Sequence, residues 1–250
     1  MADSRVVIVK NLTERFDELL VLENVSIEVL RAENLVVFGK SGSGKSVLLK
    51  CIIGLMKPDK GSIYINNQNV LELSVHQLNQ VRKDIGFLFQ SAALYDSMTV
   101  RENLSFPLKR HFNEMGPKEI DDKVRNTLEL VSLEEAIDKM PSELSGGMKK
   151  RIGLARSIIT DPALMLYDEP TTGLDPITSK EISELILNLQ KKLNMTSIVV
   201  THDLICAEII ADRAIFLRDA HVAYEGKIDE LTKSKDPFLK NFFSHGIIKV

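Results

Sequence analysis

Short apolar runs, many rich in β-branched residues, alternate with polar segments along much of the chain. Several of these runs are separated by segments with helical periodicity, which predicts a sheet that is largely parallel in its centre with helices on its faces. The first runs are joined by short turns and indicate an antiparallel edge instead. The runs are Val6–Val9, Val25–Val29, Leu35–Phe38, Ile63–Ile65, Ile85–Phe89, Leu164–Tyr167, Ser197–Val200 and Ala214–Leu217.

The pattern changes between Gln90 and about Arg156, where the strand-like runs disappear. Pro117 is expected to begin a helix with one apolar stripe, formed by Ile120, Val124, Leu128 and Val131. This stretch therefore predicts a helical arm inserted into an α/β core. After the arm, a further helix is predicted over Glu181–Leu193, with one apolar face made by Ile182, Leu185, Ile186, Leu189 and Leu193.

Composition narrows the class of protein without naming a function. The 250 residues are 44% hydrophobic and 27% charged, as in ordinary globular domains, and the net charge of −3 argues against a dedicated nucleic-acid binder. No run of about 18 apolar residues occurs, so we expect any role at a membrane to depend on a partner. Cys51 and Cys206 lie apart in apolar surroundings, which indicates simple packing in a reducing compartment.

A phosphate-binding loop is predicted at Gly39–Ser46, "GKSGSGKS", between the run Leu35–Phe38 and the helical segment Val47–Ile53. Glycines let backbone N–H groups turn toward a phosphate, and the following helix N-terminus favours the negative charge. Lys45 is placed to reach the β- and γ-phosphates of a nucleotide, and Ser46 to bind Mg²⁺. The loop residues are Gly39, Lys40, Ser41, Gly42, Ser43, Gly44, Lys45 and Ser46.

Polar residues at the ends of two later strands complete a candidate hydrolytic site. Asp168 ends the apolar run in "LMLYDEP" and is placed to hold the Mg²⁺ shell, while Glu169 follows it and is suited to polarise a water molecule. His202 ends another run, in "VVTHDL", at the same edge of the predicted sheet. We expect it to sense the γ-phosphate.

A second anion-binding feature lies about a hundred residues beyond the loop. In "LSGGMKKR", Leu144–Arg151, Ser145 is expected to cap a helix while Gly146 and Gly147 expose backbone N–H groups at its start. Two glycines weaken the first turn of a helix, so a purely structural cap does not explain them.

Together these segments resemble one family, the nucleotide-binding subunits of ABC (ATP-binding cassette) transporters. The similarity runs from about Val6 to Gly226, with the motifs in the family's order. Gly39–Ser46 resembles its Walker A loop, Leu164–Glu169 its Walker B strand, and "ELSGGMKKR" its signature motif. The other matches are Gln90 to the Q-loop glutamine, Gly173–Pro176 to the D-loop, His202 to the switch histidine and Phe16 to an aromatic that stacks on adenine.

The resemblance implies the mechanism and the site residues. ATP and Mg²⁺ would be the cofactors, with Ser46, Gln90 and Asp168 on the metal, and Glu169, His202, Lys45 and Gln90 in hydrolysis. Two identical cassettes would stack head to tail, so that Ser145, Gly146 and Gly147 grip the partner's γ-phosphate and Asp175 links the two sites. Met148 stands where most members carry Gln, but the gripping atoms are unaffected by that exchange.

The implied fold is an α/β P-loop NTPase (RecA-like) core with an antiparallel β edge subdomain and an inserted α-helical subdomain. We assign residues 1–90 and 157–230 to the core, 91–156 to the signature-bearing helical subdomain and 231–250 to a C-terminal tail, within one ABC transporter domain. "LFQSAALYDSMTVRENLSFPL" and "YDEPTTGLDP" also resemble the ATPases of Mla/Mce-type systems, which move phospholipids between the membranes of diderm bacteria.

That subfamily implies an ATPase coupled to transport, bound to the cytoplasmic face of the inner membrane as a peripheral subunit. Its partners would be a second identical subunit and an integral membrane permease, with a small regulatory subunit and a periplasmic lipid-binding protein as further candidates, and no nucleic acid. The alternatives are an ABC ATPase of another transporter class and a soluble ABC ATPase without a transport role. A nucleotide-gated binding module is disfavoured by the intact Glu169 and His202.

Three segments leave their roles open. Ala93, Leu94, Tyr95 and Met98 either line a groove for a permease helix or pack inside the arm. Lys149, Lys150 and Arg151 are expected to form a solvated helix face, with contact to a partner or to lipid headgroups as the alternative. The apolar tail Asp236–Val250 is expected either to fold back on its own domain or to grip a partner subunit.

Overall fold

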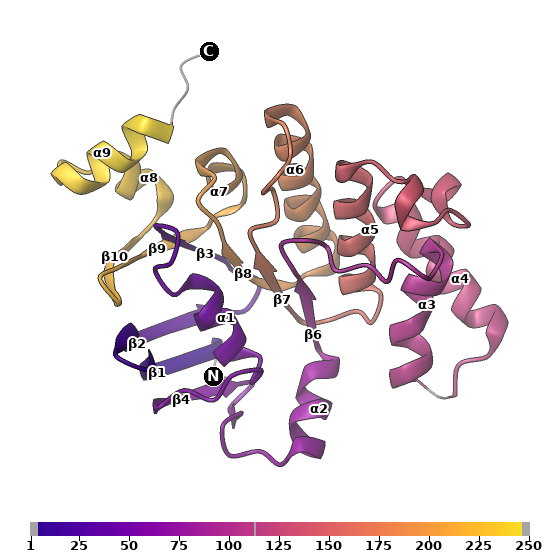
Figure 1. The fold of residues 1–250 in the computed structure, drawn as a ribbon, viewed down its shortest axis with the longest axis horizontal. Coiled ribbons are helices and arrows are strands. Elements are labelled where there is room, and N and C mark those ends of the chain that lie inside the picture. Colours follow the sequence, from indigo (N-terminus) through magenta and orange to yellow (C-terminus); the bar gives the residue numbers. More distant parts are fainter. Residues whose placement is uncertain (1–4, 113, 247–250) are drawn as a thin grey trace.

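A computed structural model describes residues 5–112 and 114–246, with the side chains of residues 244–246 left out. The centre of the described chain is a six-stranded sheet with the order β10-β9-β3-β8-β7-β6 (Figure 1). Five of its strands are parallel, and β10 pairs with β9 in the antiparallel sense. The strands are β3 (Asn34–Gly39), β6 (Ile85–Leu88), β7 (Leu164–Asp168), β8 (Thr196–Val200), β9 (Arg213–Arg218) and β10 (His221–Gly226).

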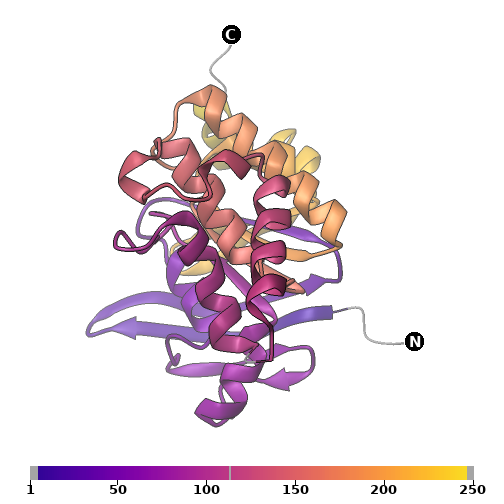
Figure 2. The ribbon, with the colours of Figure 1, turned by 90° about the vertical axis from the view of Figure 1, so that its right-hand side faces the viewer.

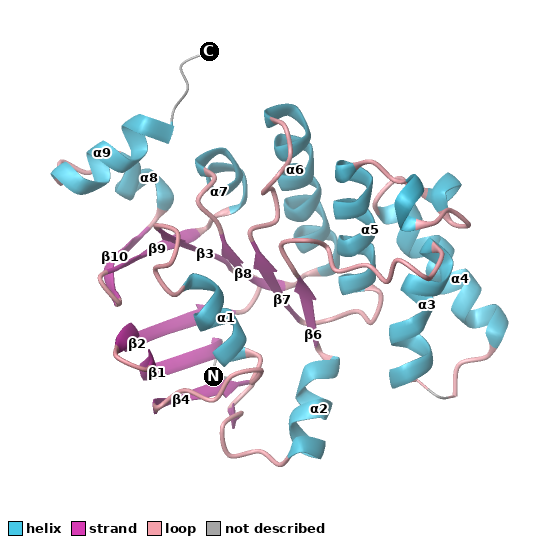
Figure 3. Cartoon of the chain, viewed as in Figure 1, coloured by secondary structure: helices cyan, strands magenta, loops and turns pink. Residues whose placement is uncertain are grey.

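The first strands form a sheet of their own, as expected for an antiparallel β edge subdomain beside the core. This second sheet is four-stranded and antiparallel, with the order β2-β1-β4-β5. Helix α1 lies between the two sheets (Figure 3), because its apolar face packs into the same core as both of them. The elements are β1 (Arg5–Phe16), β2 (Leu19–Leu30), β4 (Lys60–Ile65), β5 (Gln68–Asn69) and α1 (Lys45–Ile52).

Two cores cover the two faces of the central sheet, and β3 contributes to both. Val36 and Phe38 point into the core beneath the helices, whereas Leu35 and Val37 point into the core shared with α1 and the antiparallel sheet. Side chains of a strand alternate between faces, so a strand buried on both faces is apolar along most of its length. This explains why β3 reads as a continuous apolar run.

The segment predicted to be a helical arm contains helices and no strand among its described residues. It lies beyond the β6 edge of the sheet, at the right in Figure 1 and toward the viewer in Figure 2. Pro117 begins a helix as expected, and Ile120, Val124 and Leu128 are buried along it. The helices of this region are α3 (Val100–His111), α4 (Pro117–Leu130), the short 3₁₀ turns η1 (Glu134–Ala136) and η2 (Pro141–Glu143), and α5 (Gly146–Ile158).

The remaining helices flank the sheets. The helix predicted over Glu181–Leu193 is confirmed within a longer one, and its apolar face is buried or half-buried against the core. None of the helices in the described ranges is long and apolar enough to cross a membrane. These helices are α2 (Val75–Lys83), α6 (Pro176–Leu193), α7 (Leu204–Ile210), α8 (Ile228–Thr232) and α9 (Pro237–Gly246).

The apolar tail folds back on its own domain over the described residues. Helix α9 buries Leu239 and Phe243, and the ring of Phe243 stands edge-on to Phe38 at 6.0 Å. Phe242 contacts Phe216 in the same way at 4.5 Å. Of the tail's apolar residues, Ile247 and Ile248 lie outside the described residues.

Phe243→Ala should lower the free energy of unfolding by about 3–5 kcal/mol, because it removes a large side chain that is only 3% exposed. Urea denaturation followed by circular dichroism measures this change. Phe112→Ala is the matched control: Phe112 is 37% exposed, and its loss should cost about 1 kcal/mol or less. Equal effects of the two changes would contradict the docking of α9 on the sheet.

Candidate functional site

The predicted phosphate-binding loop joins buried strand β3 to helix α1. Gly42 and Gly44 have backbone φ values of 80° and 92°, which residues other than glycine rarely adopt. A Cβ atom on Gly44 would also lie 2.8 Å from the backbone oxygen of Val21, and one on Gly39 would lie 2.2 Å from Ser43 Oγ. The loop therefore needs glycine at these positions to turn tightly and to pack against its neighbours. In this conformation it lines a hollow at the start of α1.

The side chain of Lys45 lines this hollow. Its Nζ donates to the backbone oxygens of Gly39, at 2.8 Å, and Lys40, at 3.1 Å, and lies 3.8 Å from Glu169 Oε1. Burial lowers the pKa of Lys45, while the carboxylates of Glu169 and Asp168 oppose that shift. The side chain thus places a positive charge where a phosphate chain enters the loop.

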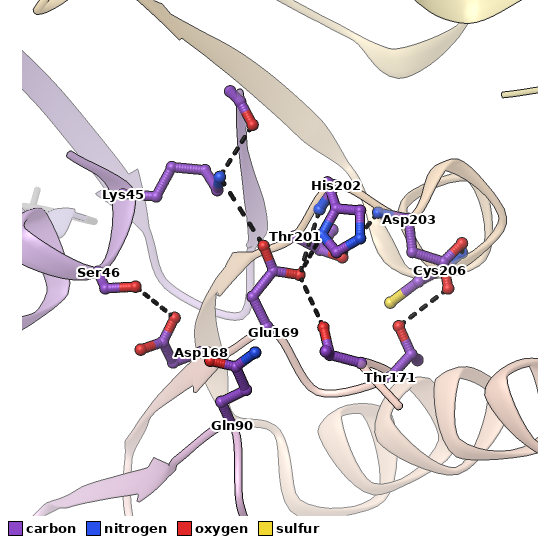
Figure 4. A network of polar contacts seen from close by, with 12 residues as sticks. Lys45, Ser46, Gln90, Asp168, Glu169, Thr171, Thr201, His202, Asp203 and Cys206 are labelled. Atoms are coloured by element: carbon purple, nitrogen blue, oxygen red, sulfur yellow. Dashed lines mark hydrogen bonds and ion pairs between the residues drawn. The ribbon is translucent and has the colours of Figure 1, made fainter. Parts of the chain in front are cut away.

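Two oxygen ligands suited to Mg²⁺ meet at the start of α1. Ser46 Oγ donates to Asp168 Oδ1 at 2.8 Å, joining α1 to the end of β7. Gln90, which follows β6, lies beside Asp168 (Figure 4). Hydroxyl, carboxylate and amide oxygens are the ligands that magnesium prefers, so these three residues fit the ion that the sequence implied.

Glu169 lies at the carboxyl end of β7 with a φ of 50°. Its Oε2 atom lies 2.8 Å from Nδ1 of His202 and accepts a hydrogen bond of 3.3 Å from Thr172 Oγ1. The opposite oxygen faces Lys45 (Figure 4). The carboxylate is therefore held from both sides, between the loop and the end of β8, where it can orient a water molecule.

These groups border one cavity of about 650 Å³, which is large enough for a nucleotide. The phosphate-binding loop, Gln90, Glu169 and His202 form one part of its wall. Phe16, at the end of β1, forms another part and is 43% exposed, as an aromatic that stacks on a base would be. Phe242 of α9 also lines the cavity, and its part in the site had no signal in the sequence.

The second anion-binding segment is not part of that cavity wall. Ser145 caps α5 as expected, since its Oγ accepts a hydrogen bond from Met148 N at 3.3 Å. Asp175 caps α6 by accepting from the backbone N–H groups of Ile177 and Thr178. The two helix starts are neighbours, because a Cβ atom on Gly147 would lie 2.9 Å from Thr178 Cγ2.

Ser145, Gly146 and Asp175 are all exposed and Gly147 is half-exposed. They therefore form a second exposed surface, which is not part of the cavity beside the loop of the same chain.

The prediction of a solvated basic face on α5 is wrong for Lys150. Lys149 is half-exposed, but Lys150 is buried, and its Nζ donates to the backbone oxygen of Gln90 at 2.6 Å. Arg151 is half-buried and pairs with Glu181 at 3.0 Å. Helical periodicity turns position 150 toward the ends of β6 and β7, where backbone oxygens can accept from the ammonium.

The segment after Gln90 is divided between the surface and the interior. Ala92 is buried and Leu94 packs against the helical core, whereas Ala93 is exposed and Tyr95 is 45% exposed. The Tyr95 ring contacts Phe106 of α3 with centroids 5.2 Å apart. Leu94 thus packs inside the arm, whereas Ala93 and Tyr95 are exposed and could contact a partner. Tyr95 is the aromatic residue on the exposed side of the segment.

Some polar contacts around the site were not anticipated. Thr171 Oγ1 donates to Asp203 Oδ2 at 2.9 Å and links the segment after Glu169 to the start of α7. The pair Thr171–Thr172 directly after "DEP" was the available signal. Cys51 and Cys206 are buried, and burial raises both thiol pKa values to about 12, in accord with simple packing.

Comparisons with known proteins agree with this geometry. A family profile described as "ABC transporter" matches residues 22–172. The chain is 41% identical over 228 residues to the intermembrane phospholipid transport system ATP-binding protein MlaF of Haemophilus influenzae, covering 91% of this chain and 86% of that protein. It is 38% identical over 236 residues to a probable ribonucleotide transport ATP-binding protein of Mycobacterium leprae.

The mycobacterial alignment covers 94% of this chain and 68% of the relative, and the corresponding share is 66% for the relative in Mycobacterium tuberculosis. Among solved structures, an ATP-binding cassette described as a dimeric post-hydrolysis state bound to ADP and Pi superimposes with a TM-score of 0.81 at 34% identity. That match covers 89% of this chain and 98% of the cassette, and it confirms the predicted α/β P-loop fold.

Proposed function

The chain belongs to the ABC transporter family of ATP-hydrolysing cassettes. From this membership, and from the similarity to a phospholipid transport ATP-binding protein, we propose that it is the motor subunit of a phospholipid transporter. ATP would bind in the cavity between Phe16 and the phosphate-binding loop. The observation that carries the ATPase assignment is the arrangement of Lys45, Glu169 and His202 beside the pair Ser46–Asp168.

Hydrolysis would proceed by in-line attack of water on the γ-phosphate. Glu169 orients the water and accepts its proton, because its carboxylate is held between Lys45 and His202. Lys45 and His202 stabilise the charge that spreads over the phosphate oxygens. Ser46, Asp168 and Gln90 would hold Mg²⁺, which when bound neutralises charge on the phosphates. Residue positions and electrostatics supply most of the rate enhancement in phosphoryl transfer.

We propose a head-to-tail homodimer as the working form. The surface at Ser145, Gly146, Gly147 and Asp175 is exposed and separate from the chain's own cavity, as a half-site for a partner's nucleotide requires. Two solved cassettes similar to this chain are described as dimeric. Residues 1–90 and 157–230 would then act as the nucleotide-binding core and 91–156 as the signature-bearing arm, with 231–250 as a tail.

A membrane permease is the proposed partner on the arm side. We propose that its cytoplasmic helix docks against the segment Ser91–Met98, where Tyr95 and Phe106 present an aromatic surface close to Gln90. The chain would thus lie on the cytoplasmic face of the inner membrane. A small regulatory subunit and a periplasmic lipid-binding protein complete the proposed system.

The similarity to the phospholipid transport protein, which spans most of both chains, supports this substrate. Import of another small molecule is the second candidate, because a methionine import ATP-binding protein of Campylobacter jejuni is 36% identical over 249 residues.

A tagged chain purified from its native membrane should retain an integral membrane permease, and the complex in vesicles should move a fluorescent phospholipid only when ATP is supplied. Tyr95→Glu should reduce retention of the permease by about tenfold, because it places a charge in an apolar interface. Leu30→Glu is the matched control, since Leu30 is 44% exposed on the antiparallel sheet. Recovery with ribosomes, or ATP-driven transport of a polar solute instead of lipid, would contradict the proposal.

A further inference from the structure

Lys150 joins Gln90 and Glu169, two residues that line the cavity proposed to hold ATP. Lys150 lies one turn into α5 and is 6% exposed. The ammonium donates to the backbone oxygen of Gln90 at 2.6 Å and to that of Glu169 at 3.3 Å. A buried ammonium is stable only with such acceptors, so Lys150 has a fixed position between the ends of β6 and β7.

The backbone near these contacts is held in an unusual conformation. Ala92, Ala93 and Glu169 have φ values of 60°, 49° and 50°, in the left-handed region that residues with a Cβ seldom occupy. Such residues keep this conformation only where their surroundings impose it. Arg156, on the same helix as Lys150, donates to the backbone oxygens of Ala92 at 3.0 Å and Ala93 at 2.8 Å.

We propose that Lys150 is a positioning residue for hydrolysis: by gripping the backbone oxygens of Gln90 and Glu169, it fixes where their side chains meet the metal and the water. The inference rests on the proposed ATPase site, but Lys150 is not one of the residues that line the cavity. Both contacts are to backbone atoms, so the side chains of Gln90 and Glu169 remain free for chemistry.

The same contact links the two half-sites. Helix α5 begins at Gly146, directly after its cap Ser145, which is proposed to face the partner's nucleotide. Lys150 follows Gly146 by four residues, a rise of about 6 Å. A shift of α5 toward a nucleotide held by the partner therefore moves the ammonium, and with it the backbone at Gln90 and Glu169. Closure of one half-site would thereby align the catalytic carboxylate of the other.

The test compares Lys150→Met, which keeps the volume but loses the donors, with Lys150→Gln, whose amide still donates. In the full chain, Lys150→Met should lower kcat for ATP by roughly 10- to 100-fold, since small misplacements of reacting groups have effects of this size. The dissociation constant for a fluorescent ATP analogue should stay within about twofold, because the loop is untouched. Lys150→Gln should restore kcat to within about threefold of wild type.

Lys191→Met is the control, because Lys191 is an exposed lysine in the last turn of another helix, α6; its kcat should equal that of wild type. If Lys150→Met does not fold, Lys150→Asn, whose amide is too short to reach both oxygens, replaces it in the comparison with Lys150→Gln. An unchanged kcat in Lys150→Met, or in Lys150→Asn where it replaces Lys150→Met, would overturn the inference. So would a loss in Lys150→Gln as large as that in the variant it is compared with. An inactive wild type would instead refute the ATPase assignment.

Discussion

Replacing Glu169 by Gln should lower kcat for ATP hydrolysis by roughly 10²–10⁴-fold while leaving ATP affinity within about threefold of wild type. Gln has the same shape, so the contacts with His202 and Thr172 can be kept. An amide cannot accept the proton of the attacking water, however. Because it is uncharged, it also cannot form the ion pair with Lys45. The loss therefore falls on the chemical step.

Steady-state phosphate release gives kcat, and titration with a fluorescent ATP analogue gives affinity. Glu184→Gln is a suitable control, because Glu184 is an exposed residue of α6 whose ion pair is with Lys180 on the same helix. This control should hydrolyse ATP at the wild-type rate. Turnover close to wild type in Glu169→Gln would remove Glu169 from its proposed role and require another group to handle the water.

The half-site geometry predicts that Ser145→Arg, introduced into the slow Glu169→Gln chain, prevents the dimer that ATP otherwise induces. Each cassette would hold ATP through its own loop and offer Ser145, Gly146 and Gly147 to its partner. Losing a few charge-assisted hydrogen bonds, with a large cation added at the interface, should weaken the dimer by about 30-fold or more. Sedimentation velocity with ATP and with ADP measures this difference.

The matched control is Ser142→Arg, the same change at an exposed serine in η2, and it should dimerise normally. The Ser145→Arg chain should still bind ATP as a monomer, because Ser145 lies outside the cavity wall. Dimerisation that persists in Ser145→Arg would place the interface elsewhere. A strictly monomeric wild type that hydrolyses ATP at its full rate would refute the two-half-site arrangement altogether.

The central strands were predictable because burial on both faces leaves little freedom in their sequence. Strands β3, β7 and β8 are buried at every position, and the runs that mark them were placed to within about one residue. Strands β5 and β10 were missed. β5 has two residues, and β10 is an edge strand whose residues are half-buried or exposed, so neither shows the apolar run that marks a buried strand.

The parts of the site that could be predicted are those formed by residues close together in the sequence. The loop, the strand end at Asp168–Glu169 and the cap at Ser145 are local features, and the structure places them where the spacing indicated. Contacts between distant segments carried no such mark. Phe242 lines the cavity because α9 packs against the sheet, and the sequence of α9 does not specify that packing. Lys150 is buried because of the way α5 packs, and a run of basic residues does not specify which of them is buried.

The position of β3 has a consequence for the synthesis of the protein. This strand leads into the phosphate-binding loop, yet its neighbours in the sheet are β8 and β9, which leave the ribosome more than 150 residues later. At about 5–20 residues per second, the nascent chain would carry an apolar, unpaired β3 for roughly ten seconds or more. During this interval the exposed apolar strand makes aggregation a competitor of folding.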